Sequence, residues 1–392
     1  MKIVIVGGGA AGLFAAINIK NKDNEVIILE KNDEVGKKIL VTGNGRCNLW
    51  NDDMDISKYS SSNNELLNSF INKEIIDETF KKLSSLFDFK IKNNYYYPYS
   101  NKAQTIRDIL VYECNRKGVE IITNYDVKSI KKNDKFIIND DITCDKLIIS
   151  TGGKSMPITG SDGSLYKILS DLGHEIIAPL PSLVPLYADE PYLNKWNGIR
   201  CDASVSSIID GEGIKTEKGE LQLTDNGISG ICVFNISRDI VKALNDNKNT
   251  SVEINFLNID NPIEYIKEKY DNQTVYEILL KFFDKKLMRV LLDKMEINER
   301  AYFKSLTTKE LSRFEKYLTK FNINITDFGD FNKSQVTQGG ISLKCINPET
   351  MESNIIEDLY LIGEVLDIDG ICGGYNLGFA WISATKVSDN IC

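Results

Sequence analysis

The sequence is poor in the residues that build metal and relay chemistry. Its 392 residues include a single histidine, His174, which lies at an expected helix-to-strand turn and is expected to be structural. Metal cages and proton relays built on several histidines are therefore nearly excluded, and no metal is expected. The 8 cysteines are scattered, and no two have C-x-x-C spacing. This argues against a zinc ribbon or an internal redox pair and favours the reduced thiols of a cytoplasmic protein.

An excess of positive charge is also missing. The 47 Lys and Arg residues are outnumbered by 56 Asp and Glu residues, which gives a net charge of -9. Binding to nucleic acid needs a basic surface, so no nucleic-acid partner is expected. A basic pocket for one phosphorylated cofactor remains compatible with this charge.

Long apolar runs are absent as well. The uncharged run from Ile3 to Ile19 is interrupted by three glycines and shows no cleavage site, so neither a signal peptide nor a membrane partner is expected. The hydrophobic fraction of 42% is ordinary for a globular protein, and the length predicts two or three packed units.

A nucleotide-binding motif begins the chain. The apolar run at residues 2–6 predicts a buried strand, and GGGAAG at residues 7–12 supplies G-x-G-x-x-G before a helix-prone segment. Gly7 suits the tight turn, Gly9 lets the backbone approach a pyrophosphate, and Gly12 allows close packing of the helix on the strand. Glu30 ends the second predicted strand, where a carboxylate can accept hydrogen bonds from both ribose hydroxyls. This motif alone fits FAD and NAD equally.

The C-terminal motif favours FAD. The predicted strand LYLIG at residues 359–363 precedes Glu364 and the glycines at 370, 373 and 374. This order resembles the second flavin signature of the glutathione-reductase-like flavoproteins, where an acid after a glycine binds the ribityl chain and the next helix faces the flavin pyrimidine. Two more segments resemble that superfamily. They are the glycine turn at residues 151–153 and the predicted strand Asp126-Val127 beside the adenine.

A narrower resemblance covers the chain from end to end. GKKILVTGNGRCNLWN at residues 36–51 resembles the signature of the HI0933-like flavoproteins, also called BaiN-like NAD(P)/FAD-dependent oxidoreductases. Further matches are YYPYSNKA (96–103), GSDGSLYKILSDLGH (160–174), LPSLVPL (180–186), LTDNGISG (223–230), VTQGGISLKCINPETMES (336–353) and GEVLDIDGICGGYNLGFAW (363–381). The departures are Asn44 where glycine is usual, Gly378 where glutamine is common, and a missing arginine in the YYP segment.

The resemblance implies an α/β fold. A discontinuous Rossmann-like FAD-binding domain of the glutathione-reductase type is expected at residues 1–188 and 329–392. A β-barrel-like insert (189–256) and a small helical subdomain (257–328) interrupt it, with a substrate pocket between flavin and insert. Motifs and resemblance together predict these cofactor-binding residues: Gly7, Gly9, Ala11, Gly12, Glu30, Lys31, Lys38, Thr42, Gly45, Arg46, Cys47, Asn48, Val127, Thr151, Gly152, Gly153, Gly363, Glu364, Gly374, Tyr375 and Asn376.

Three functions fit these expectations. The first is an FAD-dependent reductase that uses NAD(P)H and acts on a small hydrophobic substrate or an activated C=C bond, as the family's association with bile-acid reduction implies. The second is an FAD-dependent oxidase of a small amine or aminoketone that uses O₂, and the third is a flavin-binding protein without turnover. Only one dinucleotide fingerprint is visible, so NAD(P)H is expected to act as a transient reductant. No catalytic residue is assigned; a proton donor is expected to be Tyr, Lys, a carboxylate or water.

Overall fold

The structure is a computed structural model that describes residues 1–391. The chain forms two compact units. Unit 1 consists of Met1–Pro181 together with the chain from Ser334 onward, and unit 2 is Ser182–Lys333. Each unit has its own hydrophobic core.

A five-stranded parallel sheet lies at the centre of unit 1, in the order β21 (Leu359–Leu361), β11 (Lys146–Ile149), β1 (Lys2–Val6), β2 (Glu25–Leu29) and β7 (Glu120–Ile122). Most residues of the three middle strands are buried, as in parallel sheets that are covered on both faces. In β1, Val4 pairs with Leu147 on one side and Ile27 on the other. The first and last apolar runs of the sequence therefore belong to one sheet, as the expected Rossmann-like α/β fold requires.

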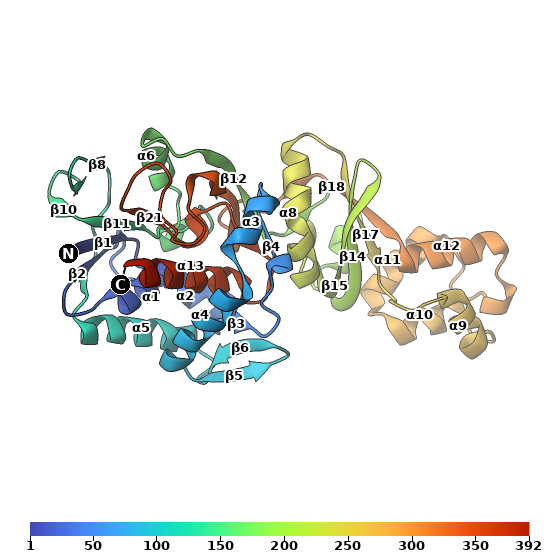
Figure 1. Cartoon of the computed structure of the whole chain (residues 1–392). Coiled ribbons are helices and arrows are strands. Elements are labelled where there is room, and N and C mark those ends of the chain that lie inside the picture. The colour runs from blue at the N-terminus through green and yellow to red at the C-terminus, as the bar shows by residue number, and fades with distance from the viewer. Residues whose placement is uncertain (392) are drawn as a thin grey trace. The chain divides into compact units, whose positions relative to one another are not determined.

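Helix α1 (Ala10–Ile19) packs against α5 (Ala103–Lys117) and α13 (Tyr375–Ile391). In Figure 1 the red α13 runs beside the blue α1, although the two helices stand at opposite ends of the sequence. The rings of Phe14 and Trp381 meet edge to face at 5.3 Å between centroids. This ring contact helps to hold α13 against α1.

The other elements of unit 1 cover the sheet and its edges. They are α2 (Lys37–Val41), β3 (Trp50–Asn51), β4 (Tyr59–Ser60), α3 (Asn64–Phe70), α4 (Lys73–Leu86), β5 (Phe89–Lys92), β6 (Tyr95–Pro98), β8 (Ile130–Lys132), β9 (Phe136–Ile138), β10 (Ile142–Cys144), α6 (Leu165–Asp171), β12 (Ile176–Ser182), β20 (Val336–Ile341) and β22 (Asp369–Gly370). Strands β8, β9 and β10 form an antiparallel sheet ahead of β11. The 3₁₀ turns are Thr42–Gly45, Ile56–Lys58, Pro157–Thr159, Leu343–Cys345 and Gly363–Val365.

Residues 63–87 form two helices, α3 and α4, because the Asn72 side chain accepts a hydrogen bond from Ile75 N at 3.0 Å and starts a new helix. One sequence expectation in unit 1 needs correction. Asp126 and Val127 form no strand. They lie in an irregular segment between β7 and β8, where Asn139 Nδ2 donates to Asp126 O.

Unit 2 is built on a seven-stranded antiparallel sheet in the order β18 (Phe321–Ile325), β17 (Thr250–Asn255), β14 (Arg200–Ile209), β15 (Glu212–Leu223), β16 (Gly227–Ser229), β13 (Leu186–Tyr187) and β19 (Asp327–Phe328). Helix α8 (Ile231–Asn245) packs on β14 and β15. The remaining helices are α7 (Leu193–Trp196), α9 (Pro262–Tyr270), α10 (Val275–Phe282), α11 (Lys285–Met295) and α12 (Thr308–Thr319), with a 3₁₀ turn at Phe303–Ser305.

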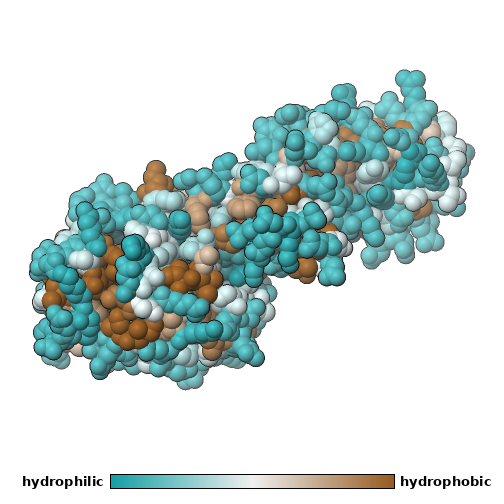
Figure 2. All heavy atoms as spheres, turned by 90° about the horizontal axis from the view of Figure 1, so that it is seen from above, coloured by the Kyte–Doolittle hydropathy of each residue, from teal (hydrophilic) through white to brown (hydrophobic). Residues whose placement is uncertain are grey.

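The surface of the part of the chain with α9–α12 is mostly hydrophilic in Figure 2. Its apolar residues share one core with the sheet of unit 2. The division into a β-barrel-like insert (189–256) and a helical subdomain (257–328) stays a prediction. Within residues 1–391, no helix has both the length and the apolar character that crossing a bilayer requires.

Candidate functional site

The first glycine turn has the geometry that its motif predicts. Gly7 has φ +102°, a conformation that favours glycine. A Cβ on Gly12 would lie 2.1 Å from the carbonyl oxygen of Gly7, so the helix can approach the strand only without a side chain there. A Cβ on Gly9 would meet nothing closer than Ser150 O at 4.0 Å. The protein therefore leaves the space next to Gly9 open, at the amino end of α1.

Glu30 is fixed beside this turn. The residue is 8% exposed, and its carboxylate accepts hydrogen bonds from Gly8 N at 2.9 Å, Asn32 N at 2.9 Å and Asn32 Nδ2 at 2.8 Å. An ionised carboxylate has about four acceptor positions, so about one remains for a ligand hydroxyl. The next residue, Lys31, pairs with Asp162 at 2.5 Å. The predicted role of Glu30 toward ribose stays a prediction, but its carboxylate also braces the glycine turn.

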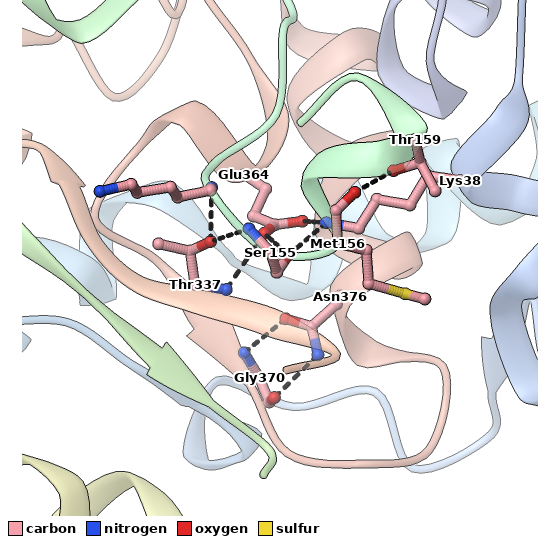
Figure 3. A network of polar contacts seen from close by, with 9 residues as sticks. Lys38, Ser155, Met156, Thr159, Thr337, Glu364, Gly370 and Asn376 are labelled. Carbon is pink, nitrogen blue, oxygen red and sulfur yellow. Dashed lines mark hydrogen bonds and ion pairs between the residues drawn. The ribbon is translucent and has the colours of Figure 1, made fainter. Parts of the chain in front are cut away.

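A second carboxylate, Glu364, is the centre of a polar network. Lys38 Nζ lies 2.7 Å from its Oε2, while Ser155 Oγ and Thr337 N donate to its Oε1 at 2.6 and 3.0 Å. Lys38 Nζ also donates to Ser155 Oγ. Figure 3 shows these side chains converging on Glu364 from separate segments of unit 1.

Glycines keep the space around Glu364 open. A Cβ on Gly153 would lie 2.5 Å from Thr337 Oγ1 and 3.0 Å from Glu364 Oε1. Gly363 has φ +73° and donates its N–H to Ser383 Oγ at 3.0 Å. A Cβ on Gly363 would come within 3.2 Å of the Ala11 Cβ, so the first and last motifs touch. Thr151 and Gly152 precede Gly153 in the turn after β11, where Gly152 also has a left-handed φ of +73°.

The loop after α2 has an unusual backbone. Gly43, Asn44, Gly45 and Cys47 all have φ between +53° and +79°. Asparagine tolerates this region better than other side chains, which explains how Asn44 stands where the family usually has glycine.

The side chains of this loop differ in access. The Cys47 thiol is fully buried, and burial raises its pKa to about 12 despite a lowering hydrogen bond with Thr42. It is therefore a packed thiol and not a nucleophile. Arg46 is exposed, and Thr42 Oγ1 donates to Ile39 O at 2.6 Å.

The segment before α13 is clamped by Asn376. Its Oδ1 accepts from Gly370 N and its Nδ2 donates to Gly370 O, both at 2.8 Å (Figure 3). Gly374 has φ +96° and packs against the chain at Asn48, since a Cβ there would lie 3.1 Å from Asn48 Oδ1. Tyr375 is buried, and burial with the nearby charge of Asp53 and Tyr95 raises its pKa to about 12.

All predicted cofactor-binding residues lie in unit 1. Val127 is buried in the irregular segment after β7, and Tyr125 N in the same segment donates to Glu30 O at 2.9 Å. The prediction missed Ser155, Thr337 and Asn32. Ser155 and Thr337 stand in motifs that the sequence shows, two residues after Gly153 and at the start of TQGG, but only the folded chain brings both to Glu364.

Several buried polar atoms of unit 1 lack partners within residues 1–391. They are Asn48 Oδ1, Ser161 Oγ, Tyr166 Oη and Asp367 Oδ1. Buried polar groups are normally hydrogen-bonded, so such atoms indicate a missing ligand or water. FAD carries hydroxyls, one ring N–H group, an amino group and phosphates. Together with the open peptide at Gly9, the residues present fit this cofactor.

Comparisons with known proteins identify the family. The model of the HI0933-like protein Rossmann domain matches residues 1–390. The 3-dehydro-bile acid delta(4,6)-reductase of Clostridium scindens is 36% identical over an alignment of 393 residues. The alignment covers 97% of this chain and 96% of that protein. The ribosomal RNA dihydrouridine synthase of Haemophilus influenzae is 30% identical over 400 residues, with coverage of 97% and 96%.

The fold has counterparts among solved structures. The 3-ketosteroid delta1-dehydrogenase from Sterolibacterium denitrificans, in complex with 1,4-androstadiene-3,17-dione, matches with a TM-score of 0.52 at 10% identity, covering 99% of this chain and 98% of that one. At this identity the match concerns the fold. Since the family model spans the chain and both glycine motifs meet in unit 1, the chain belongs to the HI0933-like family and is an FAD-dependent oxidoreductase.

Proposed function

We propose that the protein is a reductase that saturates a C=C bond conjugated to a carbonyl, with NAD(P)H as the electron donor. In the net reaction the nicotinamide loses a hydride, one carbon of the double bond gains that hydride, and the other carbon gains a proton. The nicotinamide is oxidised and the double bond is reduced. FAD, when bound, supplies reversible two-electron chemistry between donor and acceptor.

One observation carries this proposal. Two relatives that each align with almost the whole chain have names that describe the same change in different molecules. A 3-dehydro steroid acid with Δ4,6 double bonds is a conjugated ketone, and dihydrouridine is uridine with the ring double bond next to a carbonyl saturated. The shared element is an electron-poor C=C bond, which accepts hydride because the carbonyl stabilises the developing charge.

The residues of the chain position the cofactor in this proposal. Glu30 and the amino end of α1 hold the nucleotide end, and Glu364 holds the ribityl chain while Lys38 keeps this carboxylate in place. His174 is not available as an acid, because both ring nitrogens are engaged, with Leu169 O at 3.1 Å and Ser353 Oγ at 2.8 Å. The proton therefore comes from a tyrosine, a lysine, a carboxylate or water.

The proposal also divides the chain by role. Residues 1–188 and 329–392 hold FAD, while the inserted parts, 189–256 and 257–328, contribute to the choice of substrate. Support comes from the place of the motifs, since every predicted cofactor-binding residue lies outside the inserted parts.

Anaerobic mixing of the flavin-loaded protein with NADH or NADPH tests the electron donor. We expect loss of the visible flavin absorbance with a saturable concentration dependence. A conjugated 3-keto steroid acid should then restore the absorbance and gain two hydrogen atoms by mass spectrometry. Failure of both nicotinamides, together with bleaching by an aminoketone, would replace this proposal with the oxidase alternative.

A second candidate is reduction of a uracil base in RNA. The relative named as a ribosomal RNA dihydrouridine synthase supports it. A local observation in unit 2 also favours it, because residues 281–320 contain eleven Lys and Arg against six Asp and Glu in an otherwise acidic chain. Most of these side chains are exposed on and around α11 and α12. Incubating the reduced protein with ribosomal RNA and assaying dihydrouridine separates this candidate from a small-molecule reductase.

A further inference from the structure

Strand β6 presents two tyrosines to the glycine loop before α13. Successive side chains of a strand point to opposite faces, so Tyr95 and Tyr97 share one face and Tyr96 lies on the other. Tyr96 is buried, whereas Tyr95 and Tyr97 are half-buried. Tyr95 pairs with Asn51 of β3, and Asn51 Nδ2 donates to Gly373 O at 3.0 Å. A Cβ on Gly373 would lie 3.2 Å from Tyr95 Cε1, so the Tyr95 ring packs beside this loop.

The hydroxyls of Tyr95 and Tyr97 are free to bind a ligand. Neither has a hydrogen-bond partner within residues 1–391, and neither belongs to the buried polar atoms that are sealed from solvent. The hydroxyl of Tyr96, in contrast, donates to Asp52. Burial raises the pKa of the Tyr97 hydroxyl, so this group keeps its proton at neutral pH and can donate a hydrogen bond.

Arg46 adds a positive charge to this cluster. Burial and the charge of Tyr95 raise the pKa of Tyr97, and the nearby charge of Arg46 opposes them. The Arg46 side chain is exposed and forms no ion pair with any residue that the structure describes. In the turn after β3, the Asp53 carboxylate is engaged by Lys58 at 2.6 Å. The cluster therefore offers O–H and N–H donors together with a positive charge that no carboxylate compensates.

Such a cluster suits an oxygen that becomes negative during a reaction. In the proposed reduction, a hydride adds to the far carbon of a C=C bond that is conjugated to a carbonyl. The π electrons of this bond move toward the carbonyl, and its oxygen gains the negative charge of an enolate. The near carbon then takes up a proton, which restores the carbonyl. Donors aimed at the oxygen lower the barrier, because they bind the enolate more tightly than the neutral carbonyl.

We infer that Tyr95, Tyr97 and Arg46 form an oxyanion site, which binds the carbonyl oxygen of the substrate and stabilises the enolate. The inference rests on the proposed reductase function and deepens it, because it names the groups that recognise the carbonyl. The loop at Gly373 continues into Gly374 and Tyr375, which are predicted to bind FAD. A carbonyl at this site would therefore lie close to the cofactor.

A phenolate tests the site without turnover, because it is a planar oxyanion that resembles an enolate. The full-length protein, loaded with oxidised FAD, is titrated with 4-cyanophenol above the pKa of this ligand. Its methyl ether, which has the same ring but no charge, is titrated in parallel. Binding is followed by the change in visible flavin absorbance. We expect the wild type to bind the phenolate at least about tenfold more tightly than the ether, because hydrogen bonds to a charged group are the stronger ones.

Three variants locate the donors. Tyr95→Phe, Tyr97→Phe and Arg46→Gln should each weaken phenolate binding by about tenfold and leave binding of the ether within about twofold. Tyr99→Phe is the matched control, because Tyr99 follows β6, is 65% exposed and packs its ring under Lys90 Nζ at 4.5 Å. It should bind both ligands as the wild type does. The flavin content of each variant is measured first, so a loss of cofactor is not mistaken for a loss of phenolate.

Wild type that binds the phenolate no more tightly than the ether would overturn the inference, and this comparison needs no variant to fold. An undiminished preference for the phenolate in both Tyr95→Phe and Tyr97→Phe would also overturn it. A preference that disappears in these variants supports the oxyanion site even if neither NADH nor NADPH bleaches the flavin. Failure of the reductase proposal is therefore distinguishable from failure of this inference.

Discussion

Lys38 Nζ lies 2.7 Å from Glu364 Oε2, although 326 residues separate the two in the chain. Both side chains are mostly buried, with 24% and 18% of their surfaces exposed. This ion pair joins α2, which follows the first nucleotide motif, to the C-terminal motif at Glu364. It therefore couples the stability of unit 1 to the shape of the candidate cofactor site.

Lys38→Met should lower both the stability of unit 1 and the retention of flavin. The partly buried carboxylate loses a charged donor, which costs roughly 1.5–3 kcal/mol. We expect a lower free energy of unfolding in a denaturant titration and faster loss of flavin in gel filtration.

The control for Lys38→Met is Lys37→Met, one residue earlier on the same helix. Lys37 pairs with the exposed Asp33, and pairs of this kind contribute little to stability. Equal losses in both variants would show that the contact with Glu364 is not the cause.

Glu30→Ala should lower flavin retention more than Glu30→Gln. The alanine variant loses the acceptor for Gly8 N and Asn32 N as well as any acceptor for ribose, at roughly 1.5–3 kcal/mol for a charged acceptor. Glutamine keeps an amide oxygen at the same place. Dialysis at low flavin concentration followed by absorbance measures the effect, and an alanine variant as yellow as the wild type would contradict the assignment.

Two glycines of one motif should respond differently to alanine. Gly12→Ala forces a Cβ to within 2.1 Å of Gly7 O and should cost roughly 1–3 kcal/mol of folding stability. Gly9→Ala has free space in the protein and a φ of -79°, so the chain should fold normally. Its methyl group stands where the backbone is expected to approach the pyrophosphate, so flavin binding should fall. Thermal unfolding without added flavin separates the two effects, with Gly213→Ala as a neutral control because its nearest contact is 3.8 Å away.

His174 should make the protein less stable in mild acid. Burial lowers the pKa of its ring below the ordinary value of 6.5, with a smaller opposing effect of the hydrogen bond to Leu169. At pH values well above 6.5, the His174 ring is neutral in both the folded and the unfolded chain. As the pH falls below it, the unfolded chain binds a proton that the folded chain resists, so the free energy of unfolding decreases. Denaturant titrations at pH 7 and pH 5 should show a larger decrease for the wild type than for His174→Gln.

Removing residues 189–328 should leave a protein that binds FAD without turnover. Gly329 N donates to Pro185 O at 2.9 Å, so the two new ends lie close together and a short glycine-serine linker can join them. Flavin absorbance after gel filtration measures binding. A folded deletion variant without any flavin would show that the inserted parts help to build the cofactor site.

The local chemistry of the site follows from the sequence by itself. Gly7, Gly9 and Gly12 stand at fixed offsets between an apolar run and an alanine-rich helix, and backbone sterics allow few arrangements of such a segment. The solitary histidine and the absence of C-x-x-C pairs likewise restrict the chemistry before any folding is considered. The resemblance of the motifs was sufficient to predict the family and the cofactor.

Only the tertiary structure decided which distant residues meet. No periodicity in the sequence relates Thr337 to Ser155, yet both donate to one oxygen of Glu364 because β20, the turn after β11 and the segment after β21 converge there. The irregular path at Val127 was also decided in the folded chain, where Asn139 Nδ2 donates to the neighbouring Asp126 O. Side-chain hydrogen bonds and packing compete with local propensity at such points.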